Sequence, residues 1–440
     1  MLAWINRYLI GVLTPPALMG CGLWFLLYLR GRPLTHLRQI CRVLTRRDRA
    51  SGISPFRALT LALAGTLGVG NIVGVASAIA MGGAGAVFWM WVSAAVAMIL
   101  KYAEVVLAVR HRRTDAAGVP YGGAMYYIRD LFEERHHPHV GVALAAVFAC
   151  LCVLDALSTG CVLQINAVSQ ALEGVFGLEP WLCGLLLTVV CLFFVGRDVN
   201  RLSFLTERLV PLMTGGYLIL SVAVLVLRAE AVPDALGTIL RDAFTPQSAA
   251  GGVLGFLLNR GVRYGTMRGL LSNEAGCGTA PIAHAASNTK SPVEQGMWGL
   301  FEVFVDTILL CTMTALVILV NPCGLAGDGG VMMTIQAYTA VLGRGSGCFL
   351  AIAVLLFAFA TVICWSHYGA ECLRYLTTRR WIQTLYRAVT CSAVMFGALS
   401  APERLWDAAD FAIGTMTLIN LLVLILARRE IRRETRMYFG

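Results

Sequence analysis

Two stretches of this sequence combine glycine with polar side chains inside otherwise apolar sequence. The first, AGTLGVGNIVGV, holds Thr66, Gly68, Gly70 and Asn71. Hydroxyl and amide oxygens are ligands that a hard cation such as Na⁺ prefers. Glycine lets the backbone turn sharply and lets a ligand approach it closely. Because each glycine inside a helix costs roughly 1 kcal/mol relative to alanine, the stretch predicts a broken helix at a binding site.

The second stretch, RGLLSNEAGCGTAP, supplies Asn273, Glu274 and Gly276. A carboxylate within an apolar segment is costly, so Glu274 is a functional candidate, and we expect it to act as a gate. The alternative is a structural charge paired with a nearby arginine, Arg268 or Arg263.

Five more side chains are candidates because they lie inside apolar segments. Gln164 could face a substrate or only bond between helices, as could its neighbour Asn166. Thr361 could offer a hydroxyl to Na⁺, and Trp365, one helical turn later, could wall a small pocket or face lipid. Asp155 lies about fourteen residues into its segment, near mid-membrane, and could bind an ion or pack as a protonated acid.

These residues need apolar helices to position them, and the composition provides such helices. Of 440 residues, 58% are hydrophobic and 14% charged, whereas soluble domains carry about 25% charged residues. A spanning helix needs about 20 apolar residues. The sequence predicts an all-α polytopic membrane protein with about eleven such segments: 8–29, 57–81, 86–109, 141–171, 181–196, 209–227, 253–286, 296–320, 347–375, 382–399 and 407–427.

Arginine-rich segments follow the first, the third and the last of these helices. Positive charge gathers on the cytoplasmic side, so we expect the N-terminus outside and the C-terminus in the cytoplasm of a bacterial inner membrane. The net charge of +10 then reflects topology and anionic lipid headgroups, not nucleic acid.

The interrupted segments each open a run of five helices. An odd number of spans inserts the second run upside down, which is the inverted-repeat pattern of secondary transporters. The alternative for Gly70 and Gly74 is close helix packing through a small-xxx-small pattern. The predicted regions are an N-terminal helix with a basic segment, a first repeat, an outer loop, a second repeat and a basic tail: 1–56, 57–228, 229–252, 253–428 and 429–440.

Several long motifs resemble the alanine or glycine:cation symporter family, the sodium:alanine symporters. They are GVGNIVGVASAIAMGGAGAVFWMW, YGGAMYYI, RGLLSNEAGCGTAPIAHAA, VFVDTILLCTMTALVIL and CWSHYGAECLRYL. The resemblance implies a LeuT-type fold, preceded here by one extra helix, and import of alanine or glycine with Na⁺. It implies that Gln164 faces the substrate.

The predicted site therefore has two parts. The expected substrate residues are Gly68, Gly70, Asn71, Gln164, Asn273, Gly276 and Trp365. The expected ion ligands are Thr66, Asn71, Thr361 and Asp155. We expect the partners to be a small neutral amino acid, Na⁺ and the bilayer, with no other cofactor, no nucleic acid and no obligate protein partner.

Three departures from the family pattern concern the ion. Val69 and Ala360 stand where hydroxyl residues are usual, and Asp155 adds an acid. A proton-coupled or poorly coupled transporter or sensor of the same fold is therefore the alternative. An enzyme is not expected, because the chain has neither HExxH nor G-x-S-x-G.

Overall fold

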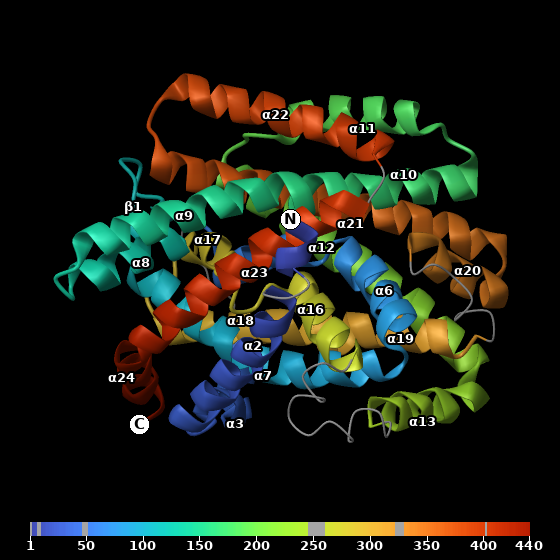
Figure 1. The fold of residues 1–440 in the computed structure, drawn as a ribbon, viewed down its shortest axis with the longest axis horizontal. Coiled ribbons are helices and arrows are strands. Elements are labelled where there is room, and N and C mark those ends of the chain that lie inside the picture. The colour runs from blue at the N-terminus through green and yellow to red at the C-terminus, as the bar shows by residue number, and fades with distance from the viewer. Residues whose placement is uncertain (1, 7–9, 46–51, 245–259, 322–329, 401–402) are drawn as a thin grey trace.

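The structure, a computed structural model, describes residues 2–6, 10–45, 52–244, 260–321, 330–400 and 403–440. The described chain is almost entirely helical (Figure 1). The first part comprises α1 (Leu2–Ile5), α2 (Gly11–Tyr28), α3 (Arg32–Thr35), α4 (Leu37–Thr45), α5 (Pro55–Thr66), α6 (Val73–Gly82), α7 (Gly85–Arg110), α8 (Ala124–Glu133), α9 (Pro138–Leu157), α10 (Leu163–Phe176), α11 (Pro180–Phe194), α12 (Val199–Leu227) and α13 (Val232–Ala243).

The second part comprises α16 (Arg260–Asn273), α17 (Ala280–Ala285), α18 (Pro292–Val303), α19 (Thr312–Leu319), α20 (Val331–Leu342), α21 (Arg344–Leu376), α22 (Arg380–Leu399), α23 (Glu403–Leu426) and α24 (Arg428–Phe439). Short 3₁₀ segments occupy Val69–Asn71 and Ala229–Ala231. Wide π-helical turns occupy Ser158–Val162, between α9 and α10, and Phe304–Cys311, between α18 and α19.

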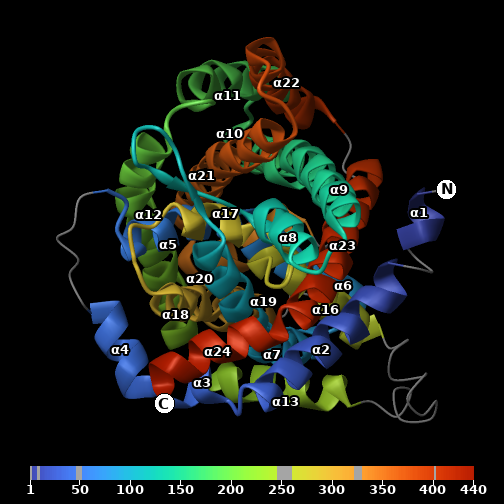
Figure 2. The same ribbon diagram turned by 90° about the vertical axis from the view of Figure 1, so that its left-hand side faces the viewer.

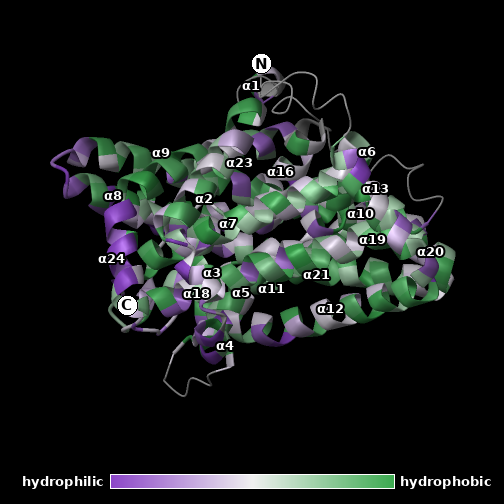
Figure 3. Cartoon of the chain, turned by 90° about the horizontal axis from the view of Figure 1, so that it is seen from below, coloured by the Kyte–Doolittle hydropathy of each residue, from purple (hydrophilic) through white to green (hydrophobic). Residues whose placement is uncertain are grey.

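The long helices are apolar on their outer faces, as a membrane requires (Figure 3). Within the described residues, seven helices are long and apolar enough to cross a membrane, or eight if α5 and α6 form one bent span. The eleven predicted spans are therefore not all confirmed. The other three coincide with α11, which has 15 residues, with α22, which is less apolar, and with α16–α17, whose first predicted residues lie outside the described chain. α11 and α22 lie side by side at one edge (Figure 1).

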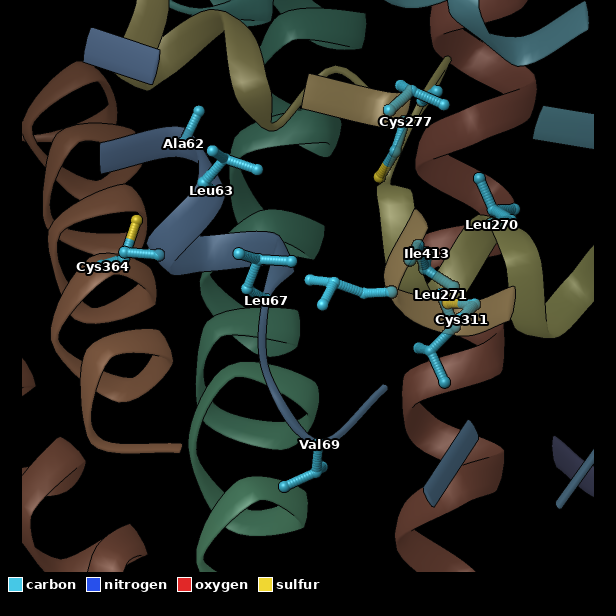
Figure 4. Close-up of a cluster of buried hydrophobic side chains, with 14 of the residues drawn as sticks. Ala62, Leu63, Leu67, Val69, Leu270, Leu271, Cys277, Cys311, Cys364 and Ile413 are labelled. Atoms are coloured by element: carbon cyan, nitrogen blue, oxygen red, sulfur yellow. The ribbon is translucent and has the colours of Figure 1, made fainter. Parts of the chain in front are cut away.

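The predicted break in the first glycine-rich stretch is present. α5 begins at Pro55, where Ser54 caps the helix by accepting a hydrogen bond from the backbone N–H of Arg57. It ends at Thr66, and α6 leaves at an angle of 61°. Leu63 and Leu67, near and just after the end of α5, are both buried, so this part of the bent helix lies inside the bundle (Figures 2 and 4).

The second break, between α16 and α17, is also present. Glu274, Gly276 and Gly278 all have positive φ, at 52°, 81° and 88°. Glu274 carries a side chain in a conformation that favours glycine, a strained state that persists only where the surroundings fix it. The Asn273 side chain stabilises the turn by accepting a hydrogen bond from the Ala275 N–H at 3.0 Å.

A buried group of charges ties this second break to α7. The Lys101 ammonium lies 3.1 Å from Glu302 and 3.9 Å from Glu104, and all three side chains are fully buried. His284 on α17 bonds the other Glu302 oxygen at 2.9 Å. Glu104 accepts hydrogen bonds from the Gly278 N–H and from Asn420, each at 3.0 Å. The unwound backbone is therefore held by a carboxylate whose charge Lys101 balances.

Two regions predicted as loop and tail are largely helical. The predicted outer loop 229–252 contains α13, whose Asp242 accepts a hydrogen bond from the Gly85 N–H at 2.8 Å. The predicted basic tail 429–440 is the helix α24. A two-residue hairpin, β1 (Arg113–Thr114) with β2 (Pro120–Tyr121), follows α7 and is the single sheet of the described chain. A search for long apolar segments does not detect α13 and α24, because these helices are amphipathic and lie outside the predicted spans.

The charged group predicts a large effect of removing its lysine. Lys101→Met leaves Glu302 and Glu104 buried without the ammonium group that pairs with both, and breaking a buried pair typically costs about 3 to 5 kcal/mol. We expect a lower midpoint of thermal unfolding in detergent and a lower yield of monodisperse protein. Lys290, the only other lysine of the chain, is exposed, so Lys290→Met is the matched control. An unchanged midpoint for Lys101→Met would show that the ion pair does not support the fold.

Candidate substrate and ion site

Both broken helices open onto one buried cavity. It is narrow, with about 10 Å³ of free volume, which is about the room needed by one water molecule. Five predicted residues line it, together with six others. The predicted ones are Thr66, Gly70, Gln164, Glu274 and Trp365; the others are Gly65, Val69, Thr159, Leu163, Leu271 and Trp406.

Gln164 supplies the unwound part of the first helix with a hydrogen-bond partner. Its side-chain oxygen accepts from the Val69 N–H at 2.9 Å, and its amide donates to the Thr159 carbonyl at 3.1 Å. A methyl group at Gly68 would lie 2.6 Å from the Gln164 oxygen and 2.8 Å from the Thr361 hydroxyl. Glycine is therefore required at position 68 by close approach.

The alternative that Gly70 and Gly74 serve helix packing holds for only one of them. Gly70 lies against α16, since an added methyl group would come 3.4 Å from the Ser272 Cα. At Gly74 no described atom lies within 4 Å of such a methyl group. The pair does not form a helix-packing motif.

Trp365 faces the interior and not lipid. It is 1% exposed, and its ring N–H donates to the Gly65 carbonyl at 3.3 Å. The ring lies directly against Gly160 in the π-helical turn. Its position is thus fixed by both neighbouring helices, and it forms one wall of the cavity.

Three oxygens meet beside the first break. The Thr361 hydroxyl lies 2.9 Å from the Ala64 carbonyl and 3.0 Å from the Phe357 carbonyl. Thr66 lines the cavity but turns its hydroxyl back to its own helix, at 3.4 Å from the Ala62 carbonyl. Backbone carbonyl and hydroxyl oxygens from α5 and α21 are the kind of ligands that suit Na⁺.

Asn71 does not cap α6 but bonds across to the second π-helical segment. Its amide donates to the Asp306 carboxylate at 2.8 Å and to the Asp306 carbonyl at 3.0 Å. Its side-chain oxygen is buried and has no hydrogen-bond partner among the described residues. Asp306 also accepts from Ser272 at 2.7 Å and from Thr307 at 2.8 Å. This oxygen-rich cluster joins the first break to the end of α16.

Glu274 lines the cavity without an arginine partner among the described side chains. It accepts a hydrogen bond from Thr279 at 2.6 Å, while Arg268 pairs with Asp410 instead. The side chain of Arg263 lies outside the described residues. Asn273 and Gly276 do not line the cavity: Asn273 donates to Thr307 at 3.0 Å, and the Gly276 carbonyl accepts from Asn420 at 2.9 Å.

Asp155 is fully buried one turn from the cavity. One carboxylate oxygen accepts from Thr159 at 2.5 Å, and the other has no partner among the described residues. No hydrogen bond joins Asp155 to Thr66, Asn71 or Thr361. Asn166, in contrast, donates to the carbonyls of Gly397 in α22 and of Ser400 directly after that helix, as the interhelical alternative predicted.

Trp406, which lines the cavity, is covered by a charged side chain. The Arg268 guanidinium lies 4.6 Å from the centre of the Trp406 ring and 3.5 Å from Asp410 on α23. A separate hollow of about 310 Å³ lies beside the hairpin that follows α7, and charged residues line it, among them Asp198, Glu371 and Arg374. This hollow shares no lining residue with the cavity.

Sequence reasoning missed the residues that hold the site together. Glu104, Glu302, Asn420, Asp410 and Trp406 were not singled out. One signal was available: Lys101 and Glu104 are charges three residues apart in an apolar segment, and such charges are usually functional or paired. Their partners on α18 and α23 could not be found from the sequence, because those contacts join distant parts of the chain.

The chain matches the sodium:alanine symporter family over residues 1–440. It belongs to that family. It is similar to the sodium/alanine symporter AgcS of Methanococcus maripaludis, with 34% identity over 88% of this chain and 84% of AgcS. It is also 36% identical to an uncharacterized transporter of Haemophilus influenzae, over 100% of this chain and 96% of that one. The resemblance noted in the sequence is confirmed, and the protein is a transporter and not an enzyme.

The fold of this sodium:alanine symporter family member is also that of a solved transporter. The crystal structure of MhsT in complex with L-phenylalanine superposes with a TM-score of 0.56 and covers 86% of this chain and 90% of MhsT, at 14% identity. The LeuT-type fold predicted from the sequence is confirmed.

The close approach at Gly68 predicts a sharp difference between two glycines of one helix. Gly68→Ala should reduce transport by the protein in proteoliposomes at least tenfold, because the methyl group displaces Gln164 and Thr361. Gly74→Ala should leave uptake unchanged, since the new methyl group meets no described atom. Equal uptake by the two variants, at equal protein incorporation, would contradict the requirement for glycine at position 68.

Proposed function

We propose that this protein imports small neutral amino acids, alanine and glycine, together with Na⁺ by alternating access. The observation that supports this most is the meeting of both unwound helix breaks at one narrow cavity beside Gln164, Glu274 and Trp365. Broken helices at corresponding places of two repeats are the transporter pattern for a central binding site.

The cavity offers what a zwitterionic amino acid needs. Helix ends carry free N–H groups that attract a carboxylate, and free carbonyls that attract an ammonium group. Gln164 has both donor and acceptor atoms, and it now uses them on the Val69 N–H and the Thr159 carbonyl. A substrate carboxylate that displaces the Gln164 oxygen would accept the Val69 N–H in its place. The freed Gln164 oxygen would then accept a hydrogen bond from the substrate's ammonium group.

For Na⁺ we propose the oxygens of Thr361, Ala64 and Phe357, with Thr66 close by on α5. We propose Asn71 as a further cation ligand. Its side-chain oxygen is buried beside the Asp306 carboxylate and has no hydrogen-bond partner among the described residues. Asp155 is proposed as a further charged oxygen at the level of Thr159. The alternative is that Asp155 carries a proton in place of Na⁺.

Glu274 is proposed as a gate, because it lines the cavity at the unwound turn that must move when access alternates. Uptake of radiolabelled alanine into proteoliposomes tests the function, with gradients of Na⁺, Li⁺ or protons imposed separately. Accumulation driven by Na⁺ is the expected result, and Glu274→Leu should abolish it. Accumulation driven by a pH gradient in Na⁺-free buffer would replace the proposal with its proton-coupled alternative.

The ion site makes a prediction about two variants. Thr361→Ala removes the hydroxyl that meets two carbonyls, and Asp155→Asn removes a charge, so both should raise the Na⁺ concentration for half-maximal uptake at least severalfold. Thr384→Ala, on the exposed side of α22, is the control and should leave it unchanged. If Asp155→Asn matches the wild type while Thr361→Ala does not, Asp155 is a packing residue.

The narrow cavity predicts a limit on substrate size. One methylene is typically worth about 1 to 3 kcal/mol in a fitted pocket, so leucine should compete poorly with alanine. Trp365→Ala removes one wall and should improve competition by leucine relative to alanine at least tenfold. Wild-type protein that is inhibited equally by leucine and alanine would refute the size limit.

The arginine pattern predicts the orientation, with the C-terminus in the cytoplasm of a bacterial inner membrane. A fluorescent protein fused after Gly440 should fluoresce, and alkaline phosphatase at the same place should be inactive. Active phosphatase would mean an outward C-terminus.

A further inference from the structure

The last helix, α24, carries four arginines on one face. Arg429, Arg432, Arg433 and Arg436 follow the spacing i, i+3, i+4, i+7, which places them on one side of a helix. All four are exposed. Of them, only Arg433 forms an ion pair with a described carboxylate, that of Glu434 at 3.6 Å. Figure 3 shows α24 as one of the most hydrophilic helices of the molecule.

The opposite face of α24 is firmly docked, so the arginine face has a fixed position. Thr435 bonds the Tyr102 hydroxyl on α7 at 2.8 Å, and Glu430 lies 3.2 Å from His111. Burial of the ring lowers the pKa of His111, but hydrogen bonds to Asp130 and Glu430 outweigh burial and raise that pKa to about 9. The ring is therefore protonated at neutral pH and holds α24 by charge.

The four arginines line a groove of about 620 Å³ that also includes Tyr28, Met437 and Gly440. Tyr28 is the last residue of α2, a candidate membrane span. The Arg432 guanidinium lies over its ring, 4.9 Å from the centre. The groove thus lies where a spanning helix ends and a cationic helix begins (Figure 2).

The surroundings of Tyr28 indicate which anion the groove takes. Its ring stacks on that of Trp24 at 4.8 Å. Trp24 lies on a face of α2 where Leu23 is 50% and Leu27 is 69% exposed. Exposed apolar side chains on a spanning helix face lipid, and aromatic rings gather at the level of the headgroups. The groove therefore adjoins acyl chains on one side and presents guanidinium groups to a phosphate on the other.

We propose that this groove is a binding site for the headgroup of an anionic phospholipid, which bridges α2 and α24. The inference does not depend on the transported substrate, and it rests on the proposed orientation only for the choice of leaflet. Anionic headgroups attract each nearby arginine with about 1 kcal/mol, so loss of two arginines should weaken binding about 30-fold.

The test uses the full-length protein in a neutral detergent, with bound lipid counted by native mass spectrometry. The probes are phosphatidylglycerol, phosphatidylcholine and inorganic phosphate. Wild-type protein should retain phosphatidylglycerol at least tenfold more tightly than phosphatidylcholine, and inorganic phosphate at millimolar concentration should not displace it. Displacement by phosphate would instead identify a site for a free anion.

Two charge-matched variants locate the site. Arg432→Gln with Arg436→Gln should weaken phosphatidylglycerol retention about 30-fold, whereas Arg38→Gln with Arg42→Gln, exposed on α4, should leave it unchanged. Arg432→Lys with Arg436→Lys keeps the charge and should retain most of the binding, which separates lost binding from lost folding. Equal weakening by the α4 variant, or none by the α24 variant, would overturn the proposal.

Discussion

Every unwound turn at membrane depth must find partners for its backbone N–H and C=O groups, because lipid offers none. The arrangement of this bundle follows from that constraint at two places. At the first break, the Gln164 side chain receives the N–H of Val69. At the second, Glu104 receives the N–H of Gly278, and Asn420 donates to the carbonyl of Gly276. The helices that carry these side chains lie where the breaks require them.

The two breaks are stabilised by different chemistry. The neutral amide of Gln164 serves the first break. A ligand can therefore replace Gln164 at the Val69 N–H without leaving an unpaired charge in the interior. A carboxylate, that of Glu104, serves the second, and Lys101 balances its charge. Lys101 also pairs with Glu302, which His284 bonds as well. Since unpaired charges in a dry interior are costly, the second break is tied to α7 and α18 more firmly than the first is tied to α10.

The sequence predicted the parts of this structure that depend on local composition. Glycine and asparagine in apolar stretches placed both breaks, and the buried Trp365 and Gln164 lie at the cavity as expected. The sequence predicts that Gly276 and Asn273 bind the substrate because they lie in the same stretch as Glu274. In the structure the Gly276 carbonyl bonds Asn420 and the Asn273 amide bonds Thr307, away from the cavity. Not all of the eleven predicted spans are confirmed, because α11 is short and α22 is less apolar. Contacts such as Asn71 with Asp306 join residues 235 positions apart, and no local pattern encodes them.

Both π-helical turns adjoin residues of the site, Gln164 after the first and Asp306 within the second. A π turn holds one residue more than an α turn, and such bulges are frequent at functional sites. Residues before and after it therefore face directions that a 3.6-residue repeat would not assign. An α-helix advances by about 100° for each residue, so deleting one residue from a regular turn rotates everything beyond it. At a π turn the same deletion restores a regular α-helix and leaves the residues beyond it facing nearly as before. Ser158–Val162 is thus a place where one residue can be lost without turning Gln164 away from the cavity.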